Sequence, residues 1–331
     1  MLDIARMKRI RLSANPRGQR LMAMGVLAPN YTVARTRVVF EGEENLPAEP
    51  VIFAMNHTDR YNYWPFQYAL WRRHDRFTAT WVKGKYYENP VVGGFMEIMN
   101  NLPTVSRGYL ITRDFVALTG RRPAGEEYAS LRERVDAVAR GEEPVASDAG
   151  LPAELWTRPR DILGRPFDPA QETWEEAVCA VFATMMARFV ELHEEAFALG
   201  LDILVFPQGT RSIRLSRGHI GMAEIALRYG RTIVPVGCSG SDRVYPGSSP
   251  FARRGKITYR IGVPIPYDAM EPFHVPDDFT PFDAKDEAQH RPRLQGLTDL
   301  VMERLDGLVD TPYRFGSDDR SGGVQGSDRF L

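Results

Sequence analysis

The sequence lacks the features that mark several classes of protein. Two cysteines, Cys179 and Cys238, are too few for a disulfide framework, so we expect a reducing compartment. No stretch approaches the roughly 20 apolar residues that a membrane-spanning helix needs. The N-terminus is basic but lacks the apolar core of a secretory signal. The formal net charge is −1, so no global positive field favours a nucleic-acid partner, and we expect none.

Two further site types are not expected. The stretch from His57 to Asp59 resembles a fragment of a metal site, but no second His, Cys or acidic cluster has ligand spacing. Gly209 and Thr210 lack the glycine spacing and the lysine of a P-loop, which argues against nucleotide hydrolysis. The remaining composition, 43% hydrophobic and 26% charged over 331 residues, is that of a globular protein with a sizeable core.

Strand-like and helix-like segments alternate along the chain. Short apolar runs predict strands at 36–42, 51–55, 78–82, 203–206, 232–237 and 256–262. Spacings of three and four predict helices at 61–73, 126–140, 174–199, 219–228 and 289–309. This alternation indicates an α/β fold with a central mixed, largely parallel sheet flanked by helices. Ligands of such sheets sit beyond the carboxyl ends of the strands.

The chain divides into three parts. Residues 1–35 are a basic helical element with interleaved apolar residues, which either packs on the domain, binds an anionic membrane surface, or does both. Residues 36–310 form the main domain, and 114–172 are expected to be a surface insertion, possibly a lid. The Gly/Ser/Asp-rich composition of 316–326 predicts a disordered tail at 311–331.

Two polar stretches follow predicted strands. Residues 56–62, Asn-His-Thr-Asp-Arg-Tyr-Asn, place a histidine where a strand gives way to a helix. Residues 206–212, Phe-Pro-Gln-Gly-Thr-Arg-Ser, combine a Pro-Gly turn with a hydroxyl and a guanidinium. Histidine suits proton transfer near neutral pH, and backbone amides with arginine bind phosphate. Together they indicate transfer chemistry on a phosphate-bearing substrate.

Four blocks in this order resemble the lysophospholipid/glycerol-phosphate acyltransferase family, which includes the 1-acylglycerol-3-phosphate acyltransferases. They are residues 56–62, 83–107, 206–212 and 233–237, and they span most of 50–265. The resemblance implies a glycerol-phosphate-acyltransferase-like fold and acyltransferase activity in phospholipid biosynthesis. Asn62 and Gln208 stand where the family has carboxylates.

The resemblance also implies roles for individual residues. His57 matches the general base that takes the proton of the acceptor hydroxyl. Asn62 would orient the imidazole ring of His57. Asp59 would do so instead if a turn of the chain placed it beside that ring. Five residues fall at positions that the family uses for the acceptor phosphate or for the shape of the acceptor site. They are Arg107, Gln208, Gly209, Thr210 and Arg211, joined in the fourth block by Pro235.

We therefore expect O-acyl transfer from acyl-CoA or acyl-carrier protein, as co-substrate with no further cofactor, to a lysophospholipid or glycerol-phosphate-type acceptor. The expected place is the cytoplasmic face of a membrane, with peripheral attachment. One alternative is a catalytically weakened homologue that binds lipid or acyl carrier; another is an acyltransferase for a non-phosphate acceptor. Lys83 and Lys85 are either solvated or contact the phosphates of the acyl carrier.

Overall fold

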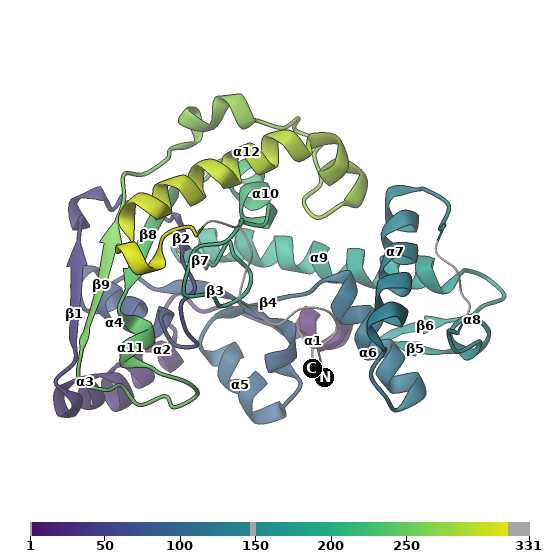
Figure 1. The fold of residues 1–331 in the computed structure, drawn as a ribbon, viewed down its shortest axis with the longest axis horizontal. Helices are drawn as coiled ribbons and strands as arrows, with labels where there is room; N and C mark the ends of the chain where they lie inside the picture. The colour runs from purple at the N-terminus through teal and green to yellow at the C-terminus, as the bar shows by residue number, and fades with distance from the viewer. Residues whose placement is uncertain (1, 146–149, 317–331) are drawn as a thin grey trace.

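A computed structural model describes residues 2–145 and 150–316 (Figure 1). Its centre is a seven-stranded sheet in the order β1-β9-β8-β2-β7-β3-β4. The strands are β1 Arg37–Glu41, β2 Ile52–Met55, β3 Thr78–Lys83, β4 Asn101–Thr104, β7 Asp202–Val205, β8 Ile233–Ser239 and β9 Lys256–Ile261. The mixed, mostly parallel α/β sheet that the sequence predicts is confirmed.

Strand direction brings the two motif stretches to one side of the sheet. β8, β2, β7, β3 and β4 are mutually parallel, whereas β9 runs antiparallel to β8 and pairs in parallel with β1. The carboxyl ends of the five parallel strands therefore lie along one edge, called here the carboxyl edge. The histidine stretch follows β2 and the second stretch follows β7, its hydrogen-bonded neighbour.

Helices cover both faces of the sheet because the side chains of β2 alternate between two cores. Ile52 and Ala54 join one apolar cluster, and Phe53 and Met55 join the other. The helices of the main domain include α4 Tyr63–His74, α5 Pro90–Ile98, α6 Arg107–Thr119, α7 Gly125–Arg140, α9 Trp174–Ala198, α10 Gly221–Arg228, α11 Ser241–Val244 and α12 Ala284–Leu308. Figure 1 shows α12 along the top of the view and α3, α11 and α5 along its lower side.

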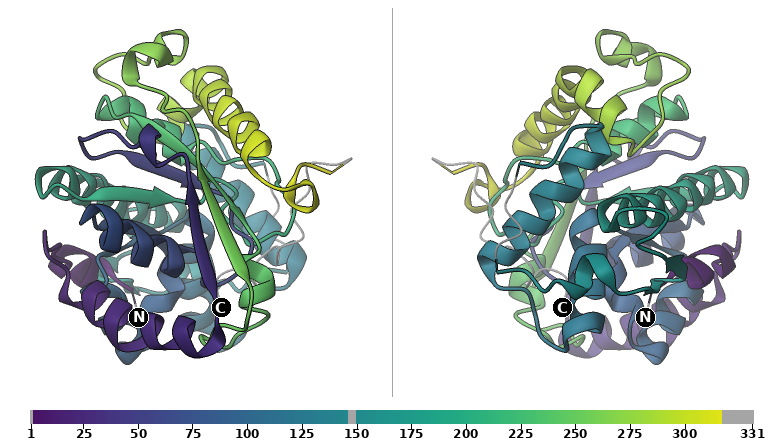
Figure 2. Two further views of the ribbon diagram at one scale, coloured as in Figure 1. Left: turned by 90° about the vertical axis from the view of Figure 1, so that its left-hand side faces the viewer. Right: turned by 90° about the vertical axis from the view of Figure 1, so that its right-hand side faces the viewer.

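The N-terminal element is helical, as predicted. It consists of α1 Ile4–Arg9, α2 Arg17–Met22, the π-helical turn η1 Ala23–Leu27 and α3 Ala28–Ala34. In the left-hand view of Figure 2 these helices, in purple, lie at the lower left of the molecule. Gln19 ties α2 to the domain, since its amide donates to the carbonyls of Thr78 at 2.7 Å and Met99 at 2.8 Å.

The segment 114–172 differs from the expected surface insertion. It contains the end of α6, α7, the short helix α8 Glu154–Thr157 and a hairpin of β5 Arg160–Ile162 and β6 Arg165–Phe167. Leu131, Val135 and Phe167 are buried in the same core as α9. Asp114 accepts hydrogen bonds from Arg160 and from the Trp174 indole. Its apolar residues pack into the domain because they complete the cover of α9.

The start of the expected tail is also ordered. Tyr313 is buried, receives a hydrogen bond from the Gly240 amide and donates one to Asp242 at 2.6 Å. Residues 311–316 thus contradict the prediction of disorder, whereas 317–331 lie outside the described residues. Pro235 lies in β8, which is not a strand at the edge of the sheet. β8 lies inside it, between β2 and β9.

Candidate active site

His57 and Asn62 face each other at the carboxyl end of β2. The imidazole Nδ1 lies 3.2 Å from the Asn62 side-chain oxygen. The amide nitrogen of Asn62 donates to the carbonyl of Asn56 at 2.8 Å, which turns the oxygen toward the ring. An oxygen at this position accepts from Nδ1–H, so the neutral ring carries its proton on Nδ1. The second ring nitrogen, Nε2, is then the one that can accept a proton.

The charge state of His57 follows from its surroundings. Burial lowers the pKa of the imidazole to about 3, against the bond to Asn62, and the charges of Arg211 and Lys83 lower it further. The ring of Phe206 stacks on it at 4.1 Å between centroids. His57 is therefore neutral at pH 7, which is the protonation state that a general base requires. Asn62 orients the ring without supplying the charge that would stabilise an imidazolium.

Asp59 lies elsewhere in the same turn. Its carboxylate accepts the hydroxyl of Thr58 at 2.9 Å and the backbone N–H of Tyr61 at 2.8 Å. The side chain is buried, and burial raises the pKa of the carboxyl group. Of the two residues predicted to orient His57, Asn62 is thus the one at Nδ1, and Asp59 shapes the turn.

Gln208 connects the two motif stretches. Its side-chain oxygen accepts the backbone N–H of His57 at 3.0 Å. Its amide nitrogen donates to the carbonyl of Arg214 at 3.1 Å and to the hydroxyl of Ser216 at 3.3 Å. The side chain is buried, so it positions the loop after β7 beneath His57. Its predicted contact with the substrate stays a prediction.

The loop after β7 approaches the histidine closely. Ser212 N–H donates to the carbonyl of His57 at 2.8 Å. Gly209 has φ +65°, and a Cβ there would come within 2.8 Å of the His219 ring, so both the backbone angle and the space call for glycine. Thr210 is buried, and Arg211 is exposed, with its charge acting on His57. Gly209 to Arg211 are thus brought beside His57, as predicted.

Arg107 is not brought beside His57. It follows β4, which lies three strands from β2, or about 14 Å at a strand spacing of about 4.8 Å. Its guanidinium packs 4.4 Å from the centroid of the Phe182 ring. It also lies 3.5 Å from the carbonyl of Phe282 and 3.8 Å from the carboxylate of Asp136. The predicted role in binding phosphate stays a prediction, and the structure gives this arginine partners within the chain.

Pro235 also lies away from the histidine turn. It is buried inside β8, where it pairs with Ala54 of β2. A Cβ added to Gly262 would come within 3.1 Å of the Pro235 ring, and the Pro235 carbonyl accepts the Gly262 N–H at 2.8 Å. These contacts fit the shape-determining role that the resemblance allows for Pro235.

Three residues that support the site have no role in the sequence-based prediction. The Asn56 side chain pairs with the backbone of Cys238, accepting at 2.7 Å and donating at 2.9 Å. Tyr259 donates its hydroxyl to the Asn62 carbonyl at 2.5 Å, and Phe206 stacks on His57. For Asn56, the only sequence feature that indicated a role at the site was its position directly after an apolar strand. The other two contacts depend on tertiary packing.

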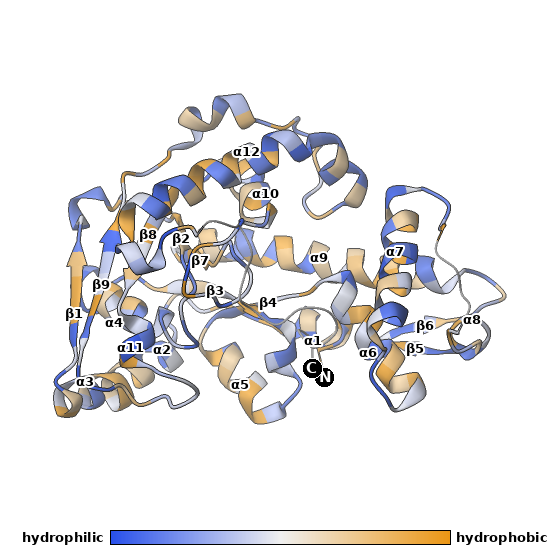
Figure 3. Cartoon of the chain, in the orientation of Figure 1, coloured by the Kyte–Doolittle hydropathy of each residue, from blue (hydrophilic) through white to orange (hydrophobic). Residues whose placement is uncertain are grey.

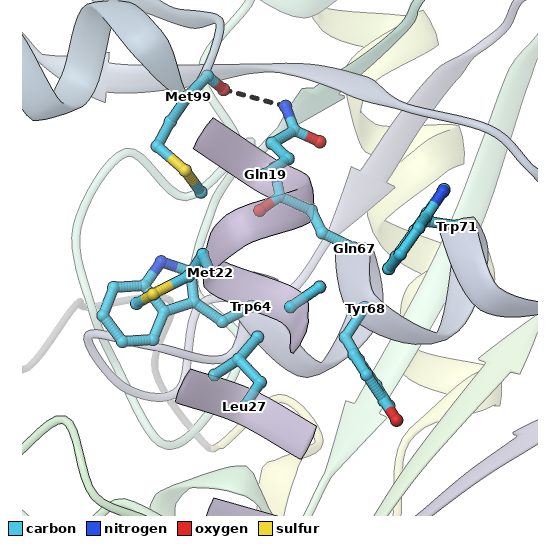
Figure 4. Close-up of a pocket in the computed structure, with 9 residues that line it drawn as sticks. Gln19, Met22, Leu27, Trp64, Gln67, Tyr68, Trp71 and Met99 are labelled. Atoms are coloured by element: carbon cyan, nitrogen blue, oxygen red, sulfur yellow. Dashed lines mark hydrogen bonds between the residues drawn. The ribbon is translucent and has the colours of Figure 1, made fainter. Parts of the chain in front are cut away.

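A small apolar cavity lies on the α4 side of the sheet, under the N-terminal helices (Figure 4). It is lined by Gln19, Met22, Ala23, Leu27, Trp64, Gln67, Tyr68, Trp71 and Met99. Its volume of about 10 Å³ is room for a single water molecule. An acyl chain would enter it only if side chains such as Met22 and Met99 moved.

Within residues 2–145 and 150–316, no group of three His, Cys, Asp or Glu side chains is arranged to hold a metal ion. Among the helices of that same part of the chain, none has the length and apolar character needed to cross a bilayer.

One comparison with known proteins, that with protein families, agrees with the sequence-based resemblance. Residues 37–131 match the acyltransferase family, and this range includes His57, Asn62 and Arg107. Among solved structures, the chain is similar to the 1-acyl-sn-glycerophosphate (LPA) acyltransferase PlsC from Thermotoga maritima. The two chains are 15% identical in sequence, with a TM-score of 0.39, and the match covers 90% of this chain and 86% of the other. Similarity this low says nothing about function. No curated protein matches the chain. Residues 37–131, which contain the histidine motif, are thus similar to the acyltransferase family.

Proposed function

We propose that the protein transfers an acyl group from an acyl thioester to a hydroxyl of a glycerol-phosphate or lysophospholipid acceptor. The observation that carries the proposal is the pair of bonds made by Asn62. One bond turns the amide oxygen toward Nδ1 of His57, which leaves Nε2 as the proton acceptor. This arrangement stands beside the loop of Gly209 and Arg211, where an anionic acceptor is favoured.

The reaction follows from this arrangement. Nε2 of His57 takes the proton of the acceptor hydroxyl as its oxygen attacks the thioester carbonyl carbon. A tetrahedral intermediate forms, and its collapse breaks the C–S bond. The leaving sulfur takes the proton that His57 held and departs as a thiol. The imidazole thereby returns to its neutral form. The products are an ester of the acceptor and the free thiol of the carrier.

The acceptor phosphate would lie beside Arg211 and Lys83, the two cations whose charges act on His57. In a short glycerol acceptor the phosphate is near the attacking hydroxyl. The hydroxyl can therefore reach His57 while the phosphate contacts Arg211 and Lys83. Arg107 would join only if the phosphate displaced the carbonyl of Phe282 and the carboxylate of Asp136.

An acyl-transfer assay tests the proposal. Release of free CoA from palmitoyl-CoA would be followed with glycerol 3-phosphate and with lysophosphatidic acid as acceptors. We expect acceptor-dependent thiol release in the wild type and a loss of about 10² to 10⁴-fold in His57→Ala. His290→Ala, a half-buried histidine on α12, is the matched control and should retain activity. Equal rates in wild type and His57→Ala would exclude His57 as the base.

A second candidate is a protein that binds acyl carrier or lipid without turnover. It is favoured by the low pKa of His57, about 3, and by the absence of charge on Asn62, which together weaken proton abstraction. The same assay separates the two, since a binding protein would show affinity for CoA but no acceptor-dependent thiol release in any variant.

Peripheral attachment to the cytoplasmic face of a membrane is part of the proposal. α3 leads into β1, whose first residues pair with β9 beside the end of β8, so α3 lies at the carboxyl edge. Exposed apolar side chains occur on elements next to this edge, at Val33 (85%) on α3, Val91 (82%) at the start of α5 and Phe251 (65%) in the loop before β9. Figure 3 shows apolar colour on α5 at the lower side of the view. Arginines of the N-terminal element add charge for anionic lipid.

Co-sedimentation with phosphatidylglycerol vesicles tests this attachment. Val33→Asp combined with Val91→Asp should reduce the bound fraction, because both changes place charge on the lipid-facing side. Val263→Asp is the control, since Val263 is 67% exposed but follows the end of β9 at the opposite edge. A reduction of the same size in Val263→Asp would contradict the assigned face.

A further inference from the structure

The loop after β7 is bonded to a segment from the far end of the described chain. Residues 309–315 follow α12, and we call them the C-terminal strap. The strap includes the short 3₁₀ turn η5 Thr311–Tyr313. The backbone carbonyl of Tyr313 accepts the N–H of Leu215 at 2.9 Å. Both residues are buried in the apolar cluster that also contains the buried side of α9, so the strap holds the loop by a backbone bond and by packing.

The peptide group between Arg214 and Leu215 is bonded on both of its sides. Its N–H donates to the Tyr313 carbonyl, and its C=O accepts the side-chain amide of Gln208 at 3.1 Å. The side-chain oxygen of Gln208 in turn accepts the backbone N–H of His57 at 3.0 Å. A continuous path of hydrogen bonds therefore runs from the strap, through the loop and Gln208, to the backbone of the histidine.

The hydroxyl of Tyr313 fixes the strap to the end of β8. It accepts the N–H of Gly240 at 3.0 Å and donates to the carboxylate of Asp242 at 2.6 Å. The N–H of Asp310 donates to the hydroxyl of Ser239, the last residue of β8, at 3.0 Å. Tyr313 thus joins the loop after β7 to the carboxyl end of β8, through its carbonyl on one side and its hydroxyl on the other.

The shape of this loop depends on such bonds. Residues 206–220, between β7 and α10, form neither a helix nor a strand. Gly209 to Arg211 lie in this loop, and Ser212 N–H donates to the carbonyl of His57 at 2.8 Å. A binding loop that is already ordered when its ligand arrives loses less conformational entropy on binding. Contacts that order residues 206–220 are therefore expected to favour binding of the acceptor.

We propose that Tyr313 is a positioning residue for the acceptor. Through Leu215 and Gln208 it holds Gly209 to Arg211 in the conformation that receives the acceptor phosphate. The proposal rests on the proposed acyl-transfer function, because that function supplies the phosphate-bearing acceptor. A tyrosine that only filled the core would stabilise the fold without acting on one kinetic constant more than on another, and this difference makes the role testable.

Amide hydrogen exchange tests the link without turnover. Tyr313→Phe keeps the ring and loses both hydroxyl bonds, so exchange in residues 207–219 should quicken by about fivefold, the factor for one net hydrogen bond. Asp242→Ala removes only the acceptor of the hydroxyl and should have a smaller effect. Asp242→Asn keeps an oxygen acceptor and should exchange as the wild type does. In the matched control Tyr229→Phe, the lost hydroxyl bond is to the Val190 carbonyl at 2.8 Å, at the far end of α10, and residues 207–219 should not change.

Steady-state kinetics with glycerol 3-phosphate test the effect on the acceptor. In Tyr313→Phe the KM for glycerol 3-phosphate should rise by about fivefold while kcat stays within about twofold of the wild type. Tyr229→Phe should change neither constant. Unchanged exchange in residues 207–219 of Tyr313→Phe would overturn the proposal, as would an unchanged KM or an equal rise in Tyr229→Phe. Exchange that quickens as expected in a protein that acylates no acceptor would leave the link between strap and loop standing and reject the acyl-transfer function.

Discussion

The side-chain nitrogen of Asn62 donates to the backbone carbonyl of Asn56 at 2.8 Å, while its oxygen faces the His57 ring at 3.2 Å. Both halves of the amide are therefore used, and a carboxylate could serve only one of them. Gln208 shows the same pattern, since its oxygen accepts the His57 N–H and its nitrogen donates to the Arg214 carbonyl. The two amides that stand where the resembling family has carboxylates are each matched to a carbonyl acceptor.

Asn62→Asp should destabilise the fold and raise the pKa of His57. The new carboxylate oxygen would face the Asn56 carbonyl, so a buried acceptor would lose its donor, at a cost of about 1–3 kcal/mol. The added negative charge would favour the imidazolium. Urea denaturation and an NMR titration of the histidine would measure the two effects. Asn45→Asp, which removes a less buried amide–carbonyl bond, is the control and should cost less. An unchanged pKa of His57 would contradict the contact.

Gln208→Glu should loosen the loop after β7 while keeping the bond to the backbone of His57. Glutamate can accept that N–H but cannot donate to the Arg214 carbonyl, so the loop loses a partly buried hydrogen bond worth about 1 kcal/mol. We expect faster amide hydrogen exchange in residues 209–216 and a higher KM for the phosphate acceptor. Gln289→Glu, on the exposed side of α12, should change neither measurement.

The pH dependence of acyl transfer should lack an inflection near the ordinary histidine pKa. Because burial lowers the pKa of His57 to about 3, the free enzyme keeps a neutral base well below pH 6.5. The folded state binds fewer protons than the unfolded state between about pH 6.5 and 3, so stability falls as the pH drops through this range. The profile of kcat/KM should be flat from pH 7 to 5.5, with folding checked by circular dichroism. An acid limb centred near pH 6.5 in folded protein would refute this.

Glu224 should make the protein less stable as the pH rises. Burial raises the pKa of its carboxyl group to about 8, with the charge of Glu287 contributing, although its oxygen accepts the Phe282 N–H. Between about pH 4.5 and 8 the folded state then binds more protons than the unfolded state, so stability is lost with rising pH. In Glu224→Gln this loss should shrink, as seen in Tm measured from pH 5 to 8. Glu303→Gln, which is exposed on α12, should follow the wild-type curve.

The sequence determined the layered α/β architecture and the pairing of the two motif stretches. An apolar run such as Val51 to Met55 is typical of a buried parallel strand, and the polar residues that follow it lie at the carboxyl edge. The long helix α9 was equally clear, because its apolar residues recur at steps of three and four over its whole length. These signals are local, and local periodicity is what a single sequence contains.

Tertiary structure alone decided how the side chains at that edge are used. Whether Asp59 or Asn62 orients His57 depends on the path of one turn, and the distance of Arg107 depends on the strand order, neither of which is a local property. Leu131 and Phe167 of the segment 114–172 are buried in the same core as α9, and that packing joins parts of the chain that local periodicity does not connect. The fit of two amides to two backbone carbonyls likewise exists only once the chain has folded, since each joins groups that the fold brings together.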